Sequence, residues 1–160
     1  MARAGVPFRM HRTGVFVILL CLAIGIRIGG WQYGLLAGAL VLASLFLHEA
    51  GHILAANSLG VPVREFGLRL GGTYVKRAHA VRHRDEIMIA ASGPLMNLLL
   101  AIPFLFVPRF GAQLAMCNLA VGLINLLPLP ASDGLRILRN ILKATGTGEA
   151  NPALSEGTKV

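Results

Sequence analysis

The chain has 160 residues, of which 55% are hydrophobic and only 14% are charged, and its mean hydropathy is +0.68. This composition is too apolar for an ordinary soluble domain. The net charge of +8 comes from basic residues in the short polar segments between apolar runs, which is typical of membrane proteins and speaks against a nucleic-acid-binding face.

Four apolar runs predict an all-α polytopic membrane protein with about four transmembrane helices. The first run covers 15–31 and is preceded by arginines; we interpret it as a retained anchor rather than a cleaved signal peptide, because no A-x-A cleavage site follows it. The other three expected spans cover 34–59, 87–107 and 114–130. Together they predict a single transmembrane domain over 1–147.

The polar segments also carry predicted structure. Alternating apolar and basic residues over 61–77 predict a small membrane-associated β-hairpin around a Gly-Gly turn. Residues 134–145 place leucines and isoleucines largely on one side and predict a C-terminal interfacial amphipathic helix, followed by a disordered tail over 148–160. His79 and His83 lie four positions apart in a charged stretch, which we interpret as a solvated turn, with a second metal site as the alternative.

Basic residues orient the predicted spans. With the N-terminus in the cytoplasm, thirteen of the fifteen Lys and Arg residues fall on the cytoplasmic side, and only Arg27 and Arg109 fall outside. Both termini are then cytoplasmic, and the ends of the second and fourth spans, near His52 and Asp133, lie on the same side. We expect a multi-pass protein of a prokaryotic cytoplasmic membrane.

Three polar residues interrupt the second apolar run, in the stretch LFLHEAGHILAANSL. His48 and His52 are four apart, so on a helix both imidazoles share one face and can bind one zinc ion. Glu49 is near enough to take a proton from water at that metal. Charges at membrane depth cost several kcal/mol unless paired or coordinated, so metal binding explains the trio better than a hydrogen-bonded cluster that packs helices.

A catalytic zinc site needs a third protein ligand. Asp133 abuts the fourth apolar run and is the only acid at a matching depth and on the same predicted side of the membrane as His52. We therefore expect Asp133 to complete the site.

Three motifs in order give the chain its resemblance to the site-2 protease family of intramembrane zinc metalloproteases: HEAGH at 48–52, SGPLMN at 92–97 and NLLPLPASDG at 125–134. The resemblance implies that His48, His52 and Asp133 hold one zinc ion. It also implies that Glu49 activates water for peptide hydrolysis. Because there is no room for the PDZ or nucleotide-sensing domain of many relatives, we expect a minimal core form.

Two asparagines are similar to family asparagines near the active site. Asn97 and Asn125 are expected to polarise or orient the substrate, and the alternative for each is an amide that bridges helices.

The expected function is regulated intramembrane proteolysis of transmembrane protein substrates in the lipid bilayer, with a regulatory partner or an oligomer left open. The alternative is a non-proteolytic zinc-binding membrane protein that binds or sequesters partner helices. An intact Glu49 favours the enzyme, because a scaffold has no use for a general base beside the metal. A metal transporter is disfavoured, because the polar residues cluster at one end of the spans rather than continuing across the bilayer.

Overall fold

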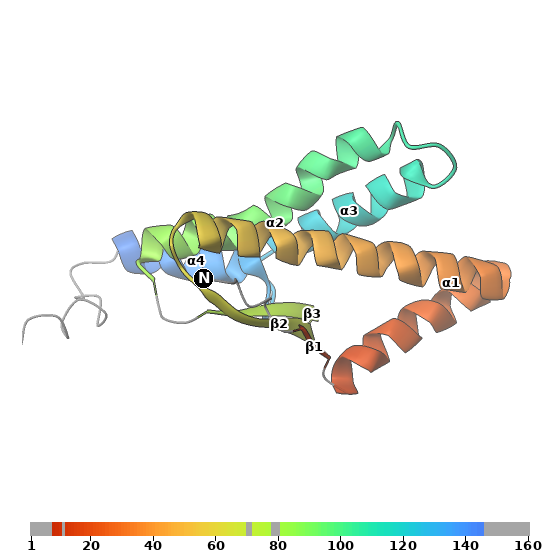
Figure 1. Ribbon diagram of the computed structural model, residues 1–160, viewed down its shortest axis with the longest axis horizontal. Coiled ribbons are helices and arrows are strands. Elements are labelled where there is room, and N and C mark those ends of the chain that lie inside the picture. Colours follow the sequence, from red (N-terminus) through yellow and green to blue (C-terminus); the bar gives the residue numbers. More distant parts are fainter. Residues whose placement is uncertain (1–7, 11, 70–71, 78–80, 146–160) are drawn as a thin grey trace, which may run out of the picture.

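A computed structural model describes residues 8–10, 12–69, 72–77 and 81–145. The described part is mostly helical, with three short strands (Figure 1). The elements in chain order are β1 (Phe8–Met10), α1 (Arg12–Ser58), β2 (Val63–Arg69), β3 (Gly72–Arg77), α2 (His83–Phe104), α3 (Gly111–Leu126) and α4 (Asp133–Thr145). The expected tail over 148–160 and His79 lie outside the described residues, and the single domain over 1–147 stays a prediction.

Helix α1 is two helical arms joined by a sharp reversal at Gly29 and Gly30. Gly30 has φ 82°, in the left-handed region that glycine enters at little cost. The arms pack closely near the reversal, because a Cβ added at Gly25 would lie 2.5 Å from the Cα of Gly34. The arms replace the two predicted spans 15–31 and 34–59, and the reversal falls slightly earlier than their expected boundary at 31–34.

Helix α2 is the centre of the bundle and contacts α1, α3 and α4. In Figure 1, α2 and α3 run beside each other and meet in a turn, while the second arm of α1 crosses them. Close approach of α3 to α2 needs Gly122, since a Cβ there would lie 3.1 Å from Pro94 O and 3.2 Å from Asn97 Cβ. These three helices therefore pack through small residues, as membrane helices often do.

The predicted third and fourth spans are shifted in the structure. Helix α2 starts before the expected 87 and ends before 107, and α3 ends at Leu126 rather than 130. Leu127 has φ −66° and ψ 142°, an extended conformation, because Pro128 disfavours helical geometry at the residue before it. The chain thus leaves α3 early and has room to turn into α4.

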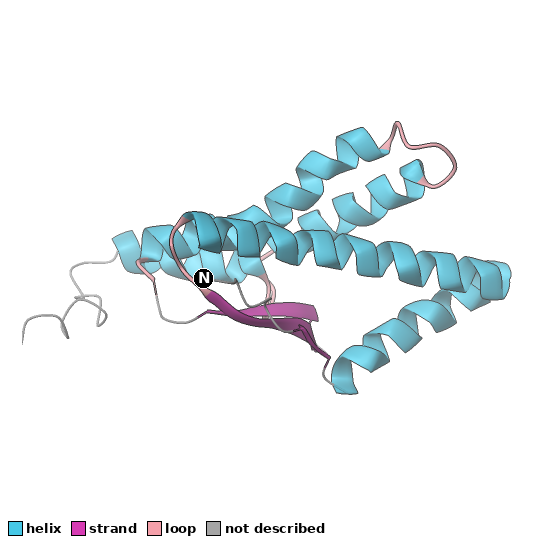
Figure 2. Cartoon of the chain, in the orientation of Figure 1, coloured by secondary structure: helices cyan, strands magenta, loops and turns pink. Residues whose placement is uncertain are grey.

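The strands form one small sheet in the order β1-β2-β3, which contacts α1 on one side of the helices (Figure 2). β2 and β3 pair antiparallel within the segment where a hairpin was expected, and β1 pairs parallel with β2 through Phe8 and Phe66. Strand β1 was not predicted, because a three-residue strand is too short for a periodic pattern. The position of this sheet at a membrane surface stays a prediction.

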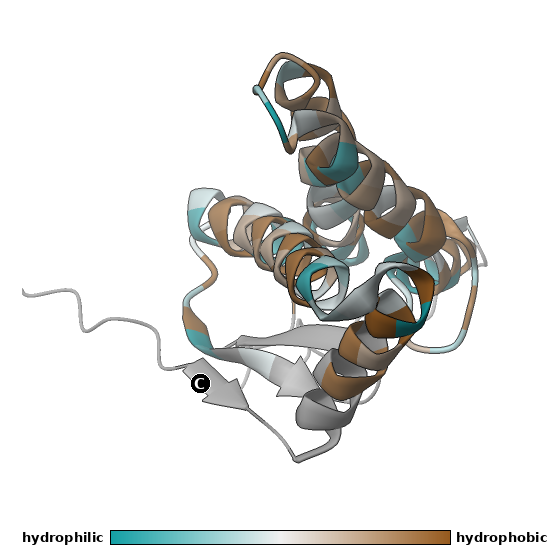
Figure 3. Cartoon of the chain, turned by 90° about the vertical axis from the view of Figure 1, so that its right-hand side faces the viewer, coloured by the Kyte–Doolittle hydropathy of each residue, from teal (hydrophilic) through white to brown (hydrophobic). Residues whose placement is uncertain are grey.

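Burial in this protein is the reverse of that in a soluble domain. Most large apolar side chains point outward, among them Ile28 at 81% and Phe106 at 83% exposure, and Figure 3 shows hydrophobic colour along most of the helices. Among the residues whose side chains the structure describes, the buried polar ones are Ser44, His48, Glu49, His52, Asn97, Asn118, Ser132 and Asp133. By length and composition, Leu22–Ser58 and His83–Phe104 are apolar enough to cross a membrane, and Gly111–Leu126 is a shorter apolar helix. An apolar exterior around a polar interior suits a lipid environment.

Candidate metal site

Two histidines on α1 form the centre of the site. His48 and His52 are one helical turn apart, only 3% and 4% exposed, and their Nε2 atoms lie 3.1 Å from each other. Their rings meet edge to face, with centroids 4.7 Å apart. The four-residue spacing thus does what helix geometry predicts, bringing two ring nitrogens to one point.

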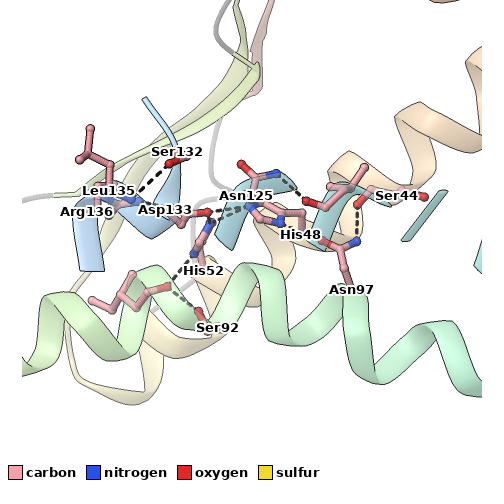
Figure 4. Close-up of polar contacts among 12 residues, drawn as sticks. Ser44, His48, His52, Ser92, Asn97, Asn125, Ser132, Asp133, Leu135 and Arg136 are labelled. Atoms are coloured by element: carbon pink, nitrogen blue, oxygen red, sulfur yellow. Dashed lines mark hydrogen bonds and ion pairs between the residues drawn. The ribbon is translucent and has the colours of Figure 1, made fainter. Parts of the chain in front are cut away.

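The first residue of α4 completes the cluster. Asp133 Oδ2 lies 2.9 Å from His48 Nε2 and 3.1 Å from His52 Nε2 (Figure 4). The turn before it is tightly held: Ala131 has φ 68°, which is rare for a residue with a side chain. Ser132 caps α4 by accepting the N–H of Leu135 at 3.2 Å. The proline-rich turn therefore aims Asp133 into the bundle.

The hydrogen bonds of Nδ1 in His48 and His52 determine whether the Nε2 atoms carry a proton or a lone pair. His52 Nδ1 lies 2.7 Å from Ile89 O, which only accepts, so His52 Nδ1 carries the proton. His48 Nδ1 lies 2.8 Å from Asn97 Oδ1 and carries its proton for the same reason. In the neutral rings both Nε2 atoms then present lone pairs toward Asp133 Oδ2.

Three electron-pair donors in mutual contact fit a cation. Tetrahedral zinc with bonds of 2.0–2.2 Å keeps its nitrogen and oxygen ligands about 3.3 Å apart, close to the 2.9–3.1 Å between these atoms. With both Nδ1 protons engaged outside the cluster, the neutral rings place no proton between these three atoms, and a cation satisfies all three electron pairs at once. The donor set therefore fits a zinc ion better than it fits a set of hydrogen bonds.

Gly93 of the SGPLMN motif leaves space beside the Nε2 atoms of the two histidines. A Cβ added at Gly93 would collide with His52 Nε2 and lie 2.9 Å from His48 Nε2. Helix α2 comes this close because α1 also has a glycine there: a Cβ on Gly51 would lie 2.5 Å from Ser92 O. Two glycines on facing helices thus leave space at the ligand nitrogens.

Glu49 follows the first histidine and is 3% exposed. The potential ligand atoms of His48, Glu49 and His52 lie within 4.8 Å of one another. Glu49 Oε2 is the one buried side-chain oxygen or nitrogen that lacks a hydrogen-bond partner among the described residues. A buried carboxylate oxygen without a partner is costly, and at a functional site it is suited to bind or accept a proton from a reacting molecule.

Arg136, one turn after Asp133, holds the other oxygen of that carboxylate. Its Nη1 donates to Asp133 Oδ1 and its Nη2 to Glu86 Oε1, both at 2.7 Å. Burial by itself lowers the pKa of Arg136, but the hydrogen bonds and charges of Glu86 and Asp133 outweigh it and raise the pKa, so the guanidinium stays charged. Arg136 thus ties α4 to the first turn of α2.

The other expected residues are placed less centrally. Asn97 contacts His48 directly, whereas Asn125 donates to Val121 O within α3 at 2.9 Å and, among the described residues, forms no hydrogen bond with the three converging side chains. His83 Nδ1 lies 2.8 Å from Asn140 Oδ1, between α2 and α4. Within the described ranges, the histidine and acid group suited to a metal is that of His48, Glu49 and His52, and Asp133 lies against the same two histidines.

Several residues of the site were missed from the sequence. Ser44, Asn118, Gly93 and Arg136 all contact the converging side chains or their partners. A signal existed for Asn118, because an amide inside an apolar run needs buried partners just as Asn97 does. For Arg136 the sequence offered only a basic residue on an amphipathic helix, a common feature with no implied partner.

The fold and the site together define a helical protein of membrane type with a buried metal-binding donor set. A model of Peptidase family M50 matches residues 36–113 and 108–156, and the chain belongs to this family.

Relatives are consistent with that assignment. A zinc metalloprotease of Methanocaldococcus jannaschii is 31% identical over 150 residues, which cover 86% of this chain and 43% of the relative. A Synechocystis protein is 29% identical over 180 residues, which cover 98% of this chain and 46% of that protein. The solved site-2 protease from Methanocaldococcus jannaschii matches with a TM-score of 0.74 and 27% identity, over 91% of this chain and 71% of that one. The chain therefore spans less than half the length of these two sequence relatives.

Proposed function

We propose that this chain is a zinc metalloendopeptidase that hydrolyses peptide bonds of transmembrane proteins within the membrane. The observation that carries the proposal is the convergence of His48 Nε2, His52 Nε2 and Asp133 Oδ2 beside a buried glutamate oxygen without a partner. A scaffold that only binds zinc has no need for that glutamate. Membership of Peptidase family M50 supports the same reaction.

His48, His52 and Asp133 would hold the metal, and Glu49 would move the proton. Zinc bound there supplies a Lewis acid that polarises a carbonyl and lowers the pKa of water. Glu49 takes one proton from the attacking water as the new bond to the carbonyl carbon forms. It then passes this proton to the amide nitrogen as the carbon–nitrogen bond breaks, which releases an amine and a carboxylic acid, and the acid gives its remaining proton to water.

The substrate has to present an extended strand, because a helix hides its peptide bonds. The sheet offers a place for this: β1 and β3 lie on either side of β2, so β3 has one edge that no described strand occupies. An unwound substrate segment adding to β3 would be held by backbone hydrogen bonds. The alternative is that the sheet only rests on the lipid headgroups.

The location that we propose is a cytoplasmic membrane, with several spans and with the site open to cytoplasmic water. Hydrolysis needs water, and the end of the bundle with His52 and Asp133 also holds the basic residues of α4. Leu138, Ile141 and Leu142 are exposed on α4, which supports an interfacial position for this helix.

The proposal is tested by separating metal binding from hydrolysis. Wild type and Glu49→Gln are purified in detergent, their zinc is counted, and each is co-expressed with a panel of single-span reporter proteins. We expect about one zinc per chain in both, and reporter cleavage in wild type alone. Cleavage by Glu49→Gln at the wild-type rate would rule out Glu49 as the general base. Zinc without cleavage of any reporter by wild type would favour a protein that sequesters partner helices.

A further inference from the structure

Three fully buried polar side chains lie next to the metal site, one on each of the helices α1, α2 and α3. Ser44, Asn97 and Asn118 are each 0% exposed and form a continuous chain of hydrogen bonds. The chain ends at the outer nitrogen of His48, and Figure 4 shows Ser44, Asn97 and His48 side by side. Asn118, the most remote member, has no hydrogen bond to the three converging side chains among the described residues.

We propose that Asn118 is a positioning residue that fixes the tautomer and ring orientation of His48 by acting through Asn97. This inference rests on the proposed function only in taking His48 as a metal ligand. Asn118 lies in the middle of an apolar helix and yet determines that the lone pair of His48 is on Nε2, facing the metal site.

The direction of the hydrogen bonds carries the inference. Asn97 Nδ2 has two hydrogens, and both are used: it donates to Ser44 O at 2.9 Å and to Asn118 Oδ1 at 2.7 Å. Its Oδ1 is therefore turned toward His48 and accepts the Nδ1 proton at 2.8 Å. Reversing the Asn97 amide would place its NH₂ against that N–H and its oxygen against two other acceptors.

Asn118 is itself fixed in one orientation. Its Nδ2 donates to Leu114 O at 2.9 Å and to Ser44 Oγ at 3.0 Å. The Ser44 hydroxyl donates to Leu40 O at 3.0 Å and so has a lone pair for Asn118. His48 Nδ1 donates at one end of this chain, and the backbone carbonyl of Leu40 accepts at the other, so every donor between them points away from His48. This direction leaves Asn118 Oδ1 facing Asn97.

The orientation of Asn118 should affect how tightly His48 binds a metal ion. With Asn118 in place, the proton of neutral His48 stays on Nδ1 and the lone pair of Nε2 faces His52 and Asp133. Without it, Asn97 loses one of the two acceptors that hold its amide, so the reversed amide becomes more populated and favours a proton on Nε2, where it blocks coordination. Partners that orient a metal-binding histidine typically change metal affinity by roughly 10–100-fold.

A double substitution separates positioning from simple helix packing. Asn118→Leu removes the acceptor, and we expect zinc affinity, measured by chelator competition in detergent, to fall roughly 10-fold. Adding Asn97→Asp should restore most of the affinity, because a carboxylate presents an oxygen to His48 whichever way it turns. If Asn118 only joined helices, this second change would remove a further interhelical hydrogen bond and bind zinc still more weakly.

The matched control is Ala115→Leu, a buried position one turn earlier on α3. It should lower thermal stability and leave zinc affinity near wild type. Asn118→Leu with wild-type zinc affinity, or a double variant that binds more weakly than Asn118→Leu, overturns the proposal.

A second readout is independent of zinc binding. The ¹⁵N spectrum of metal-free, histidine-labelled protein should show a protonated Nδ1 at His48 in wild type and a mixture of tautomers in Asn118→Leu. An unchanged tautomer overturns the positioning role. Failure of wild type to bind zinc, together with the expected tautomer change, would instead contradict the proposed function alone.

Discussion

His48 and Asp133 stand 85 positions apart in the chain, and their side chains meet at 2.9 Å between Nε2 and Oδ2. His48 lies in the second arm of α1, and Asp133 is the first residue of α4. Only the folded bundle brings them together, with α2 packed against both helices. The placement of α4 therefore decides whether the donor set has two members or three.

Removing the third donor should abolish tight zinc binding. Asp133→Ala leaves two ring nitrogens, and we expect its affinity to fall by more than the roughly 10–100-fold seen for outer partners of metal ligands. Zinc per chain after dialysis is the measurement. Asp85→Ala, which removes an acid from the first turn of α2, is the control and should keep its zinc. Full zinc occupancy in Asp133→Ala would exclude Asp133 as a ligand.

A single methyl group at Gly93 should close the site. Gly93→Ala places a Cβ against His52 Nε2, so we expect loss of zinc in a protein that still folds. The control is Gly38→Ala on α1, where a Cβ meets nothing within 4 Å. Alanine is favoured over glycine inside a helix by up to about 1 kcal/mol, so Gly38→Ala should be as stable as wild type or more so. Thermal stability and zinc content are measured together, and a zinc-loaded Gly93→Ala would contradict the geometry.

Arg136 should tighten the site without contacting the metal. Arg136→Leu frees Asp133 Oδ1 and unties α4 from Glu86, and we expect zinc to bind roughly 10-fold more weakly. Arg136→Lys should recover only part of this, because a lysine cannot bridge two carboxylates with the fixed fork of a guanidinium. Arg139→Leu, at an exposed position on the same helix, is the control. Equal chelator-competition curves for Arg136→Leu and Arg139→Leu would show that the bridge has no role at the metal.

The predicted orientation can be tested by chemical labelling. In a background of Cys21→Ala and Cys117→Ala, we expect Thr145→Cys at the end of α4 to be shielded from a membrane-impermeant maleimide in intact cells. Phe110→Cys, in the turn between α2 and α3, should react from outside. Both should react after the cells are opened. The reverse pattern would place the site on the other side of the membrane.

Sequence alone was most informative where a short spacing meets a regular helix. His48 and His52 converge because four residues make about one helical turn, and Asp133 was found because an acid beside an apolar run needs a partner. The amphipathic helix expected over 134–145 corresponds to α4 at Asp133–Thr145, since its residue pattern has the helical period.

What the sequence missed depends on contacts between distant segments. The pairing of β1 with β2, the chain from Ser44 to Asn118 and the bridge from Glu86 to Arg136 each join different elements. The periodic pattern of apolar residues within one helix or strand carries no information about such contacts. Asn125 donates its amide N–H to Val121 O within its own helix, and its expected role toward a substrate stays a prediction.

The order of the elements along the chain has a bearing on biosynthesis. The ribosome makes α1 first and α4 last, so an emerging chain carries His48, Glu49 and His52 long before it carries Asp133. Until α4 docks beside α2, the centre lacks the carboxylate of Asp133 and the ion pair between Arg136 and Glu86. If the site acts as we propose, it is complete only after the last helix has inserted.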